Sequence, residues 1–461
     1  MKRIPKKFHV RAESFLYDNE ESGAFLEPGL GKTGVSLNLI KRLKREGTFK
    51  GALVIAPLRP CYLVWPKEPR KWDQFKSLSY TILHGPQKDE KFTRKRDIFL
   101  MNPEGLEWLL DQLYGVPRSK WPFNVLIVDE STKFKHPRSK RSQNLKTIAK
   151  KISRKHLLTG TPAPQGLRDL FGQYLIMDGG KTFGTEKGAF EKRYFYKSGY
   201  MGKELKPLPR AAKEIKKAME PSAITMRAED YLELPELIIN RIDIELPPKA
   251  REAYNKLEKE LLLKFEEGKV TIANAGVLSS KCRQIACGGV YLDSEEREWK
   301  NLHDAKTEAC FDLVEQLQGN PALLAYEFRH DLDRLEKTFG KGIPAIRSRM
   351  SMQRTKQVED KWNRGEIPLL FGQHTSIALG LNLQESGNTL IIHTLPWSYE
   401  TYYQLIRRIY RQGQQNKKVF VHILIAKKTV EEAVWKSLVE NQGTHESLYA
   451  ALGEHLVGEP T

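Results

Sequence analysis

The chain has 461 residues, of which 40% are hydrophobic, so it is long enough for two or three domains with buried cores. It carries 76 lysines and arginines against 57 aspartates and glutamates, a formal net charge of +19 at pH 7. This basic excess favours polyanionic partners, with nucleic acid first, although ribosomal, membrane-surface and merely soluble proteins are also basic. The four cysteines are too scattered for a disulfide framework and suit a reducing compartment.

The N-terminal segment 1–10 is basic and lacks the apolar core of a signal peptide. No apolar run approaches the roughly 20 residues that a membrane-spanning helix needs. We therefore expect no membrane partner and a location in the cytoplasm, the nucleoid or the nucleus.

A glycine-rich segment near the N-terminus follows a predicted strand over 23–26 and precedes a predicted helix. Gly29 and Gly31 allow a tight turn whose amide groups point inward at phosphate oxygens, and the start of the helix adds positive potential. In such a loop Lys32 reaches the β- and γ-phosphates, and the hydroxyl of Thr33 ligates Mg²⁺. The alternative is a glycine-rich turn with a chance Lys-Thr pair.

From residue 23 to about residue 177, short apolar strands alternate with amphipathic helices. Continuous Val, Ile and Leu runs indicate strands covered on both faces, as in a parallel sheet. Ligands of such sheets bind at the carboxyl ends of the strands. The further strands expected here are 51–57, 80–83, 97–101, 125–128 and 156–159, with helices over 103–113 and 139–152.

Residues 178–300 break this rhythm, and their glycine, proline and basic aromatic stretches predict loops and short helices, followed by a long helix over 247–262. A second alternation then predicts strands at 322–326, 368–371, 389–393 and 419–425 and helices at 331–339, 353–364, 398–411 and 430–438. We expect an α/β fold of two lobes with parallel sheets and helical insertions between them. The predicted N-terminal lobe covers residues 1–233, and the C-terminal lobe covers residues 234–450.

Polar residues end two of the strands expected in the N-terminal lobe. After the first, Asp129 would hold Mg²⁺ and Glu130 would orient and deprotonate an attacking water. After the second, the hydroxyls of Thr159 and Thr161 would bond across to the Asp-Glu strand and sense the γ-phosphate. An ordinary turn explains either pair when it is read alone, and the upstream Gly-Lys-Thr weighs against that explanation for the acidic pair.

The C-terminal lobe carries a cluster of arginines in the helix expected over 398–411. Gln404, Arg408 and Arg411 are spaced i, i+4 and i+7, so they would project from one face of that helix. A solvated basic helix is the usual explanation. The glutamine and the closing Gly-Gln favour another, in which arginines from a second lobe supply charge to a γ-phosphate.

The order of these motifs resembles helicase superfamily 2, and within it the Swi/Snf-type ATP-dependent DNA translocases. Weaker matches are residues 53–57 with Trp65, residues 281–285, residues 323–328 and residues 395–397, and the resemblance covers about residues 23–437. The principal motifs are Gly-Leu-Gly-Lys-Thr at residue 29, Asp-Glu at 129, Leu-Thr-Gly-Thr-Pro at 158, Gly-Leu-Asn-Leu at 380 and Gln-x-x-x-Arg-x-x-Arg-x-Gly-Gln at 404.

The resemblance implies two RecA-like lobes, ATP with Mg²⁺ in the cleft between them, and double-stranded DNA tracked across both. The sequence departs from the family's pattern at two places. The family's Asp-Glu-Ala-His is Asp-Glu-Ser-Thr here, and residues 8–13 do not contain its glutamine motif for adenine. The implied roles are phosphate binding by Gly29, Gly31, Lys32 and Thr33, metal binding by Thr33 and Asp129, general base by Glu130, coupling by Thr159 and Thr161, nucleotide contact by Gly380, and completion of the site by Gln404, Arg408 and Arg411.

The expected function is an ATP-dependent motor that translocates on double-stranded DNA, without a base-reading motif. The first alternative is a helicase that separates the strands of DNA or RNA. The second is a binding module that has kept the fold without hydrolysis, and the intact Lys32, Glu130, Arg408 and Arg411 argue against it. Neither a protein partner nor a pathway follows from the sequence.

Overall fold

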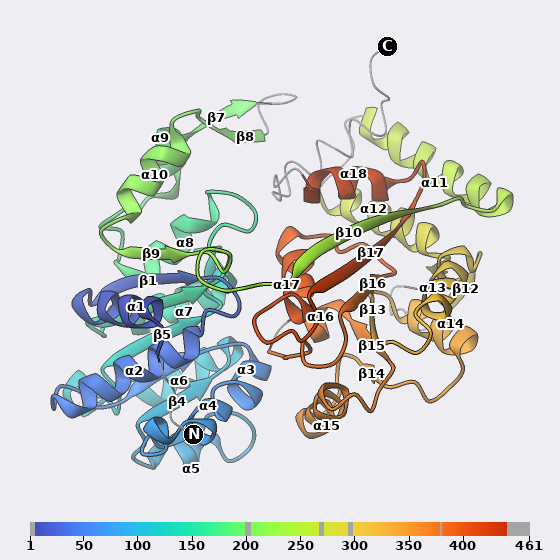
Figure 1. Cartoon of the computed structure of the whole chain (residues 1–461). Coiled ribbons are helices and arrows are strands. Elements are labelled where there is room, and N and C mark those ends of the chain that lie inside the picture. The colour runs from blue at the N-terminus through green and yellow to red at the C-terminus, as the bar shows by residue number, and fades with distance from the viewer. Residues whose placement is uncertain (1–4, 199–203, 267–271, 294–297, 379, 440–461) are drawn as a thin grey trace. The chain divides into compact units, whose positions relative to one another are not determined.

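The chain divides into two compact units, Met1–Glu233 and Leu234–Thr461. The computed structural model describes residues 5–198, 204–266, 272–293, 298–378 and 380–439. Each unit is an α/β fold built on its own parallel sheet (Figure 1), which confirms the predicted fold class. Within the described ranges, every helix is too short or too polar to cross a lipid bilayer.

The N-terminal unit contains a seven-stranded sheet with the strand order β3-β4-β2-β5-β6-β1-β9, and all its paired strands are parallel. Every residue of β2, β4 and β5 is buried, as expected for strands covered on both faces. The strands are β1 (Glu21–Leu26), β2 (Ala52–Ile55), β3 (Tyr80–Ile82), β4 (Ile98–Met101), β5 (Val125–Asp129), β6 (Arg154–Thr159) and β9 (Ala223–Met226).

Helices connect these strands. The one predicted over 139–152 begins at Lys140, because the side chain of Ser139 caps its first turn by accepting from the amide of Ser142. The one predicted over 103–113 opens instead with a 3₁₀ turn. The helices of the unit are α1 (Lys7–Asp18), α2 (Lys32–Arg45), α3 (Leu58–Leu63), α4 (Lys67–Lys71), α5 (Lys88–Thr93), α6 (Leu106–Leu113), α7 (Lys140–Ala149), α8 (Asp169–Met177), α9 (Lys187–Tyr194) and α10 (Ala211–Met219).

The sequence predicted loops and short helices in the region 178–300. The region also contains strands, so the prediction is wrong at the residues that form them. Strands β7 (Phe195–Ser198) and β8 (Glu204–Pro207) form an antiparallel hairpin, and β9 is an edge strand beside β1. Strand β10 (Glu236–Ile244) lies where the boundary between lobes was expected. Most of its side chains are partly or fully exposed, so the strand includes charged residues and lacks the apolar run of an inner strand.

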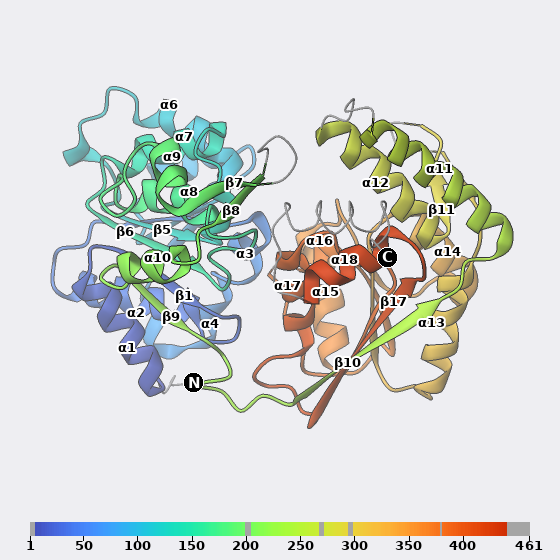
Figure 2. The same ribbon diagram turned by 90° about the horizontal axis from the view of Figure 1, so that it is seen from above.

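The C-terminal unit contains a six-stranded parallel sheet with the order β10-β17-β16-β13-β15-β14. Its first strand, β10, pairs with its last, β17, over nine residues on each strand (Figure 2). The other strands are β11 (Gly289–Tyr291) and β12 (Trp299–Asn301), which form a separate antiparallel pair, and β13 (Ala322–Tyr326), β14 (Ala345–Ile346), β15 (Leu369–Gln373), β16 (Thr389–Ile392) and β17 (Lys418–Ala426).

The helix that carries the predicted arginine cluster is shorter than expected. Helix α17 (Tyr399–Ile409) ends two residues before Arg411, because Tyr410 leaves the helical conformation with ψ at 83°. The spacing argument therefore holds for Gln404 and Arg408 and is wrong for Arg411. The other helices are α11 (Pro248–Glu266), α12 (Ile272–Cys287), α13 (Ala305–Gln316), α14 (Arg329–Phe339), α15 (Met352–Asn363), α16 (His374–Ile377) and α18 (Val430–Val439).

Candidate active site

The glycine-rich loop between β1 and α2 has the geometry of a phosphate cradle. Gly29 and Gly31 have φ values of 96° and 72°, a left-handed conformation that glycine adopts at little cost. Leu30 between them is fully buried and anchors the loop. Gly31 is also the N-cap residue of α2 and, having no side chain, does not cap the amide groups at the start of that helix, where Lys32 and Thr33 lie. These amides can serve an anion.

Three neighbouring strands bring the predicted residues of the N-terminal unit to one edge of the sheet. Strand β6 lies between β1 and β5, with Thr159 paired with Phe25 on one side and Leu158 paired with Asp129 on the other. A Cβ atom added to Gly160 would lie 3.4 Å from Nζ of Lys32. The phosphate loop, the acidic strand end and the Thr-Gly-Thr turn therefore meet at the carboxyl ends of parallel strands.

Asp129 is a buried carboxylate that Trp65 orients. Its side chain is only 8% exposed, and its Oδ2 accepts a 3.0 Å hydrogen bond from Nε1 of Trp65. Burial, followed by repulsion from Glu130, raises the pKa of Asp129 to about 6, while the charge of Lys32 acts in the opposite direction. A buried carboxylate of this kind gains from a nearby cation. Together with the Thr33 hydroxyl it supplies the hard oxygen donors that suit Mg²⁺.

Glu130 has a strained backbone. Its φ of 55° and ψ of 56° place it in the left-handed region, which is uncommon for a residue with a side chain. A one-turn 3₁₀ helix, η4 (Ser131–Phe134), follows directly. Ser131 and Thr132, which replace the family's alanine and histidine, are both buried. The strain at Glu130 must therefore be maintained by the packing of the residues that follow it.

The two threonines of the Thr-Gly-Thr turn have different environments. Thr159 is fully buried, and its Oγ1 accepts a 3.2 Å hydrogen bond from the amide of Thr161. That contact gives Thr159 the turn-forming role that the sequence left open. Thr161 is partly exposed and follows Gly160, the residue of this turn that lies close to Nζ of Lys32.

The predicted residues of the C-terminal unit form a second group. Nη1 of Arg408 donates to the carbonyl of Leu381 at 2.8 Å, and its Nε donates to the carbonyl of Gln404 at 2.9 Å. Nη1 of Arg411 donates to Oδ1 of Asn382 at 2.7 Å. Both arginines therefore hold the Gly-Leu-Asn-Leu segment, which begins with Gly380 at a φ of 73°.

Arg411 keeps an unused donor. Burial lowers the pKa of its guanidinium, and its Nε has no hydrogen-bond partner among the residues that the structure describes. A buried guanidinium donor without a partner is costly, so the site is suited to an anionic ligand group.

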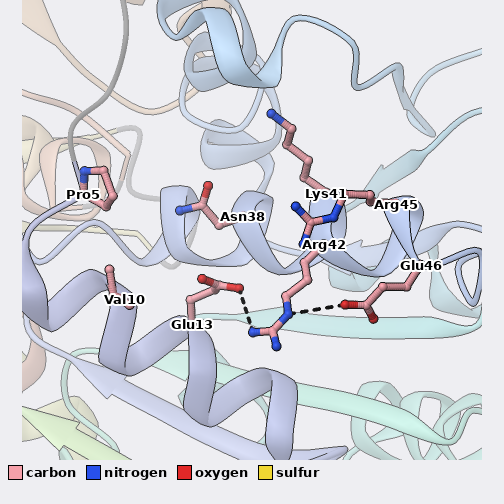
Figure 3. Close-up of a pocket in the computed structure, with 8 residues that line it drawn as sticks. All are labelled: Pro5, Val10, Glu13, Asn38, Lys41, Arg42, Arg45 and Glu46. Atoms are coloured by element: carbon pink, nitrogen blue, oxygen red, sulfur yellow. Dashed lines mark ion pairs between the residues drawn. The ribbon is translucent and has the colours of Figure 1, made fainter.

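A hollow of about 460 Å³ between α1 and α2 does not belong to this site (Figure 3). Arg42 crosses it with ion pairs of 3.5 Å to both Glu13 and Glu46 and lies 3.3 Å above the ring of Tyr17. The contacts with Glu13 and Tyr17, both in α1, fasten that helix onto α2. The lining residues of α2 begin at Asn38, more than a turn beyond Lys32.

In the C-terminal unit, a hollow of about 650 Å³ opens at the carboxyl ends of β13 and β15. Exposed arginines at 329 and 349 line it together with Trp397. Arg283, from the weaker motif 281–285, is buried beneath, where it pairs with Glu327, donates to the carbonyl of Leu395 at 2.7 Å and lies 5.0 Å from the Trp397 ring. The motif matches at residues 281–285, 323–328 and 395–397 did not predict these contacts, and Arg329 and Arg349 lie outside all three ranges.

Two family models match the chain: the SNF2-related domain over residues 14–288 and the helicase conserved C-terminal domain over residues 305–413. Protein p41 of Acyrthosiphon pisum secondary endosymbiont phage 1 is 35% identical, over 97% of this chain and 98% of its own. The chromatin remodeling factor mit1 of Schizosaccharomyces pombe is 26% identical over 88% of this chain, and the DNA repair and recombination protein RAD54B of Homo sapiens is 23% identical over 95%. The chain spans only 30% and 54% of the lengths of mit1 and RAD54B.

A solved structure titled as the SWI2/SNF2 ATPase core of Sulfolobus solfataricus in complex with dsDNA covers 99% of the chain at 19% identity, with a TM-score of 0.45. The first family model alone covers more than half of the chain, and the phage protein matches nearly end to end. The predicted resemblance is thereby confirmed. The chain belongs to the SNF2-related family of helicase superfamily 2, the Swi/Snf type, and is an ATP-hydrolysing enzyme of the kind that forms ATP-dependent, DNA-directed motors.

Proposed function

We propose that this protein is a motor that uses ATP hydrolysis to translocate along double-stranded DNA and to move or remodel complexes bound there. The observation that supports it most is the convergence of Lys32, Asp129 and the Thr-Gly-Thr turn at one edge of the N-terminal sheet. Such a motor works wherever DNA is, in the cytoplasm, the nucleoid or the nucleus.

In this proposal the phosphate loop binds ATP. The amides around Gly29 and Gly31 and the ammonium of Lys32 contact the phosphates. Thr33 and Asp129 hold Mg²⁺, which neutralises charge on the phosphate oxygens. Glu130, next along the chain, orients the attacking water and accepts its proton.

Residues of the C-terminal unit complete the reaction. Arg408 and Arg411, with Gln404, supply hydrogen bonds and positive charge to the γ-phosphate as charge develops there. The unpartnered Nε of Arg411 supports this role, because it is a donor that a phosphate oxygen would satisfy. Gly380 faces the nucleotide. The hydrogen bonds from Arg408 to Leu381 and from Arg411 to Asn382 couple the Gly-Leu-Asn-Leu segment to the binding of the γ-phosphate by these arginines.

Double-stranded DNA is the proposed track. The formal charge of +19 supports binding to phosphates in general, and the exposed Arg329 and Arg349 provide cations at the 650 Å³ hollow. RAD54B, one of the relatives, is named for DNA repair and recombination. Nothing in the sequence resembles a base-reading motif, so we propose binding that is largely independent of DNA sequence.

ATPase activity measured with duplex DNA, single-stranded DNA, RNA or no polymer tests this proposal. We expect the strongest stimulation with duplex DNA and a steep loss of binding as salt is raised, because contacts to phosphates release counterions. A translocase should displace a triplex-forming strand and leave a plain forked duplex paired. Efficient unwinding of the fork, or stimulation by RNA alone, would support a strand-separating helicase instead. Absence of hydrolysis under every condition would support a binding module.

A further inference from the structure

Helix α8 contacts both turns that carry the proposed chemistry of the N-terminal unit. All nine of its residues are buried. One is the Asp-Glu turn, in which Ser131 follows Glu130. The other is the Thr-Gly-Thr turn, in which Pro162 follows Thr161. A side chain of α8 that binds Ser131 and Pro162 therefore acts one residue away from the proposed base and from a coupling hydroxyl.

Gln173 of α8 makes such a bridge. Oγ of Ser131 donates to its Oε1 at 2.7 Å, and its Nε2 donates to the carbonyl of Pro162 at 2.6 Å. Nε2 also donates to the carbonyl of Asp169 at 2.9 Å, one helical turn earlier. Gln173 is fully buried and Ser131 is 1% exposed, so no water replaces these bonds cheaply.

Asp169 makes a second bridge between the same two segments. Its Oδ2 accepts a 2.8 Å hydrogen bond from the amide of Gln165, which follows the Thr-Gly-Thr-Pro turn. The same oxygen lies 3.7 Å from Nζ of Lys135, which follows the Asp-Glu turn. Asp169 and Gln173 are four residues apart, so they lie on one face of α8.

A glycine allows α8 to approach this closely. A Cβ added to Gly172 would lie 2.3 Å from the carbonyl oxygen of Lys135 and 2.8 Å from that of Phe134. Any larger residue would push the helix away from η4. The helix is thus packed directly against the segment that maintains the strained backbone of Glu130.

We propose that Gln173, supported by Asp169, is a positioning residue of the ATPase reaction. Its amide group joins the Asp-Glu turn to the Thr-Gly-Thr turn, so that the base at Glu130 and the hydroxyl at Thr161 keep a fixed relation and move together during turnover. Neither Gln173 nor Asp169 belongs to the motifs recognised in the sequence. The inference rests on the proposed function, because it takes Glu130 as the base.

Two substitutions break the bridge to different extents. Gln173→Met keeps a side chain of similar length and removes both polar groups, and Ser131→Ala removes only the bond to the Asp-Glu turn. We expect Gln173→Met to lower kcat roughly ten- to a hundredfold, because misplacing a base by a fraction of an ångström is costly. KM for ATP should stay unchanged, because the phosphate loop is untouched. Ser131→Ala should lower kcat less.

Ser142→Ala is the matched control. Ser142 is also buried, and its Oγ donates to the carbonyl of Phe134 in η4 at 3.3 Å, without reaching the Thr-Gly-Thr turn. It should lower the melting temperature and leave kcat as in the wild type. The double variant Ser131→Ala/Gln173→Met should be no slower than Gln173→Met alone, since both remove the same bond.

Different variants test the positioning role of Gln173 and the proposed role of Glu130 as the base. Wild-type kcat in both Gln173→Met and Ser131→Ala, or an equal loss in Ser142→Ala, would overturn the positioning role. If Gln173→Met does not fold, Ser131→Ala decides by the same criterion. Undiminished turnover in Glu130→Gln would instead remove the proposed base, whatever the Gln173 variants do.

Discussion

Nε1 of Trp65 donates a 3.0 Å hydrogen bond to Oδ2 of Asp129, and both side chains are buried. The bond stabilises the charged form of a carboxylate whose pKa is raised to about 6 by burial and by Glu130. A tryptophan outside the phosphate loop therefore orients the proposed metal ligand and favours its charged form.

Trp65→Phe removes that bond and keeps an aromatic ring in the core. We expect the Mg²⁺ concentration for half-maximal ATPase activity to rise about tenfold, as for other residues that orient metal ligands, and kcat to recover at saturating Mg²⁺. Trp72→Phe is the control, because Nε1 of Trp72 donates at 2.8 Å to Glu68, outside the site. Equal Mg²⁺ dependence in the two variants would show that the Asp129 contact is irrelevant to metal binding.

Lys32→Ala should reduce hydrolysis at least a hundredfold, because Lys32 contributes charge to the phosphates and no packing to the core. Alanine suits a helix, so the circular dichroism spectrum should not change. Lys41→Ala on the exposed side of α2 should keep wild-type activity. Normal turnover in Lys32→Ala with an intact fold would refute the phosphate-binding role.

Glu130→Gln should bind ATP normally and hydrolyse it roughly a hundred- to ten-thousandfold more slowly, since an amide cannot accept the proton of water. Glutamine occupies the same volume and can adopt the same backbone conformation. Nucleotide binding measured by equilibrium fluorescence, together with single-turnover hydrolysis, separates the two steps. A variant that hydrolyses at the wild-type rate would assign the base to another residue.

Arg411→Ala should lower kcat on the order of a hundredfold with a modest loss of ATP affinity, because its contribution belongs to the transition state. Arg408→Ala should also lower kcat. It should in addition lower the melting temperature, since its side chain satisfies the carbonyls of Leu381 and Gln404. A pure loss of ATP affinity at constant kcat would contradict the placement of either arginine at the γ-phosphate.

His156→Gln should reduce the acid sensitivity of the fold. His156 is fully buried, and burial, followed by the charge of Arg154, lowers its pKa from 6.5 to about 3. Between these values the unfolded chain binds a proton that the folded chain does not. The free energy of unfolding therefore falls as the pH falls from about 6.5 towards 3, by up to about 1.4 kcal/mol per pH unit.

The glutamine variant lacks this proton, so its stability should depend less on pH over that range. Denaturant unfolding at pH 7, 5.5 and 4.5 measures the slope. His84→Gln, at an exposed histidine, is the control for the substitution itself. Parallel curves for His156→Gln and the wild type would contradict the prediction.

The sequence predicted those parts of the fold whose pattern is local. Strand β13 (Ala322–Tyr326) coincides with its predicted range because every residue in it is apolar and buried. Strand β9 was missed because its four residues at a sheet edge carry too little pattern, and β10 because its exposed side chains are partly charged. Local propensity cannot indicate an edge strand whose partner is supplied by a distant segment.

The same distinction applies to the site. Glycines, an acidic pair and hydroxyls at strand ends could be located from spacing, because parallel strands end at a common edge. The bond between Trp65 and Asp129 joins residues 64 positions apart, and the bridge from Gln173 to Ser131 joins residues 42 positions apart. No periodicity links such pairs, so only the fold reveals them. Helix α17 ends before Arg411 because of the backbone conformation of Tyr410, which the spacing of the arginines could not predict.

The pairing of β10 with β17 determines when the C-terminal unit can become complete. Among the described residues, β10 lies at the edge of the sheet and pairs with β17 alone, so the first strand of the unit depends on its last. During synthesis, Glu236–Ile244 therefore leaves the ribosome long before Lys418–Ala426 exists to receive its hydrogen bonds. A chain that stops short of residue 418 retains an unpaired, partly apolar strand, which is a template for aggregation. We infer that nonsense truncations in this part of the gene are lost as insoluble protein and do not accumulate as a free N-terminal unit.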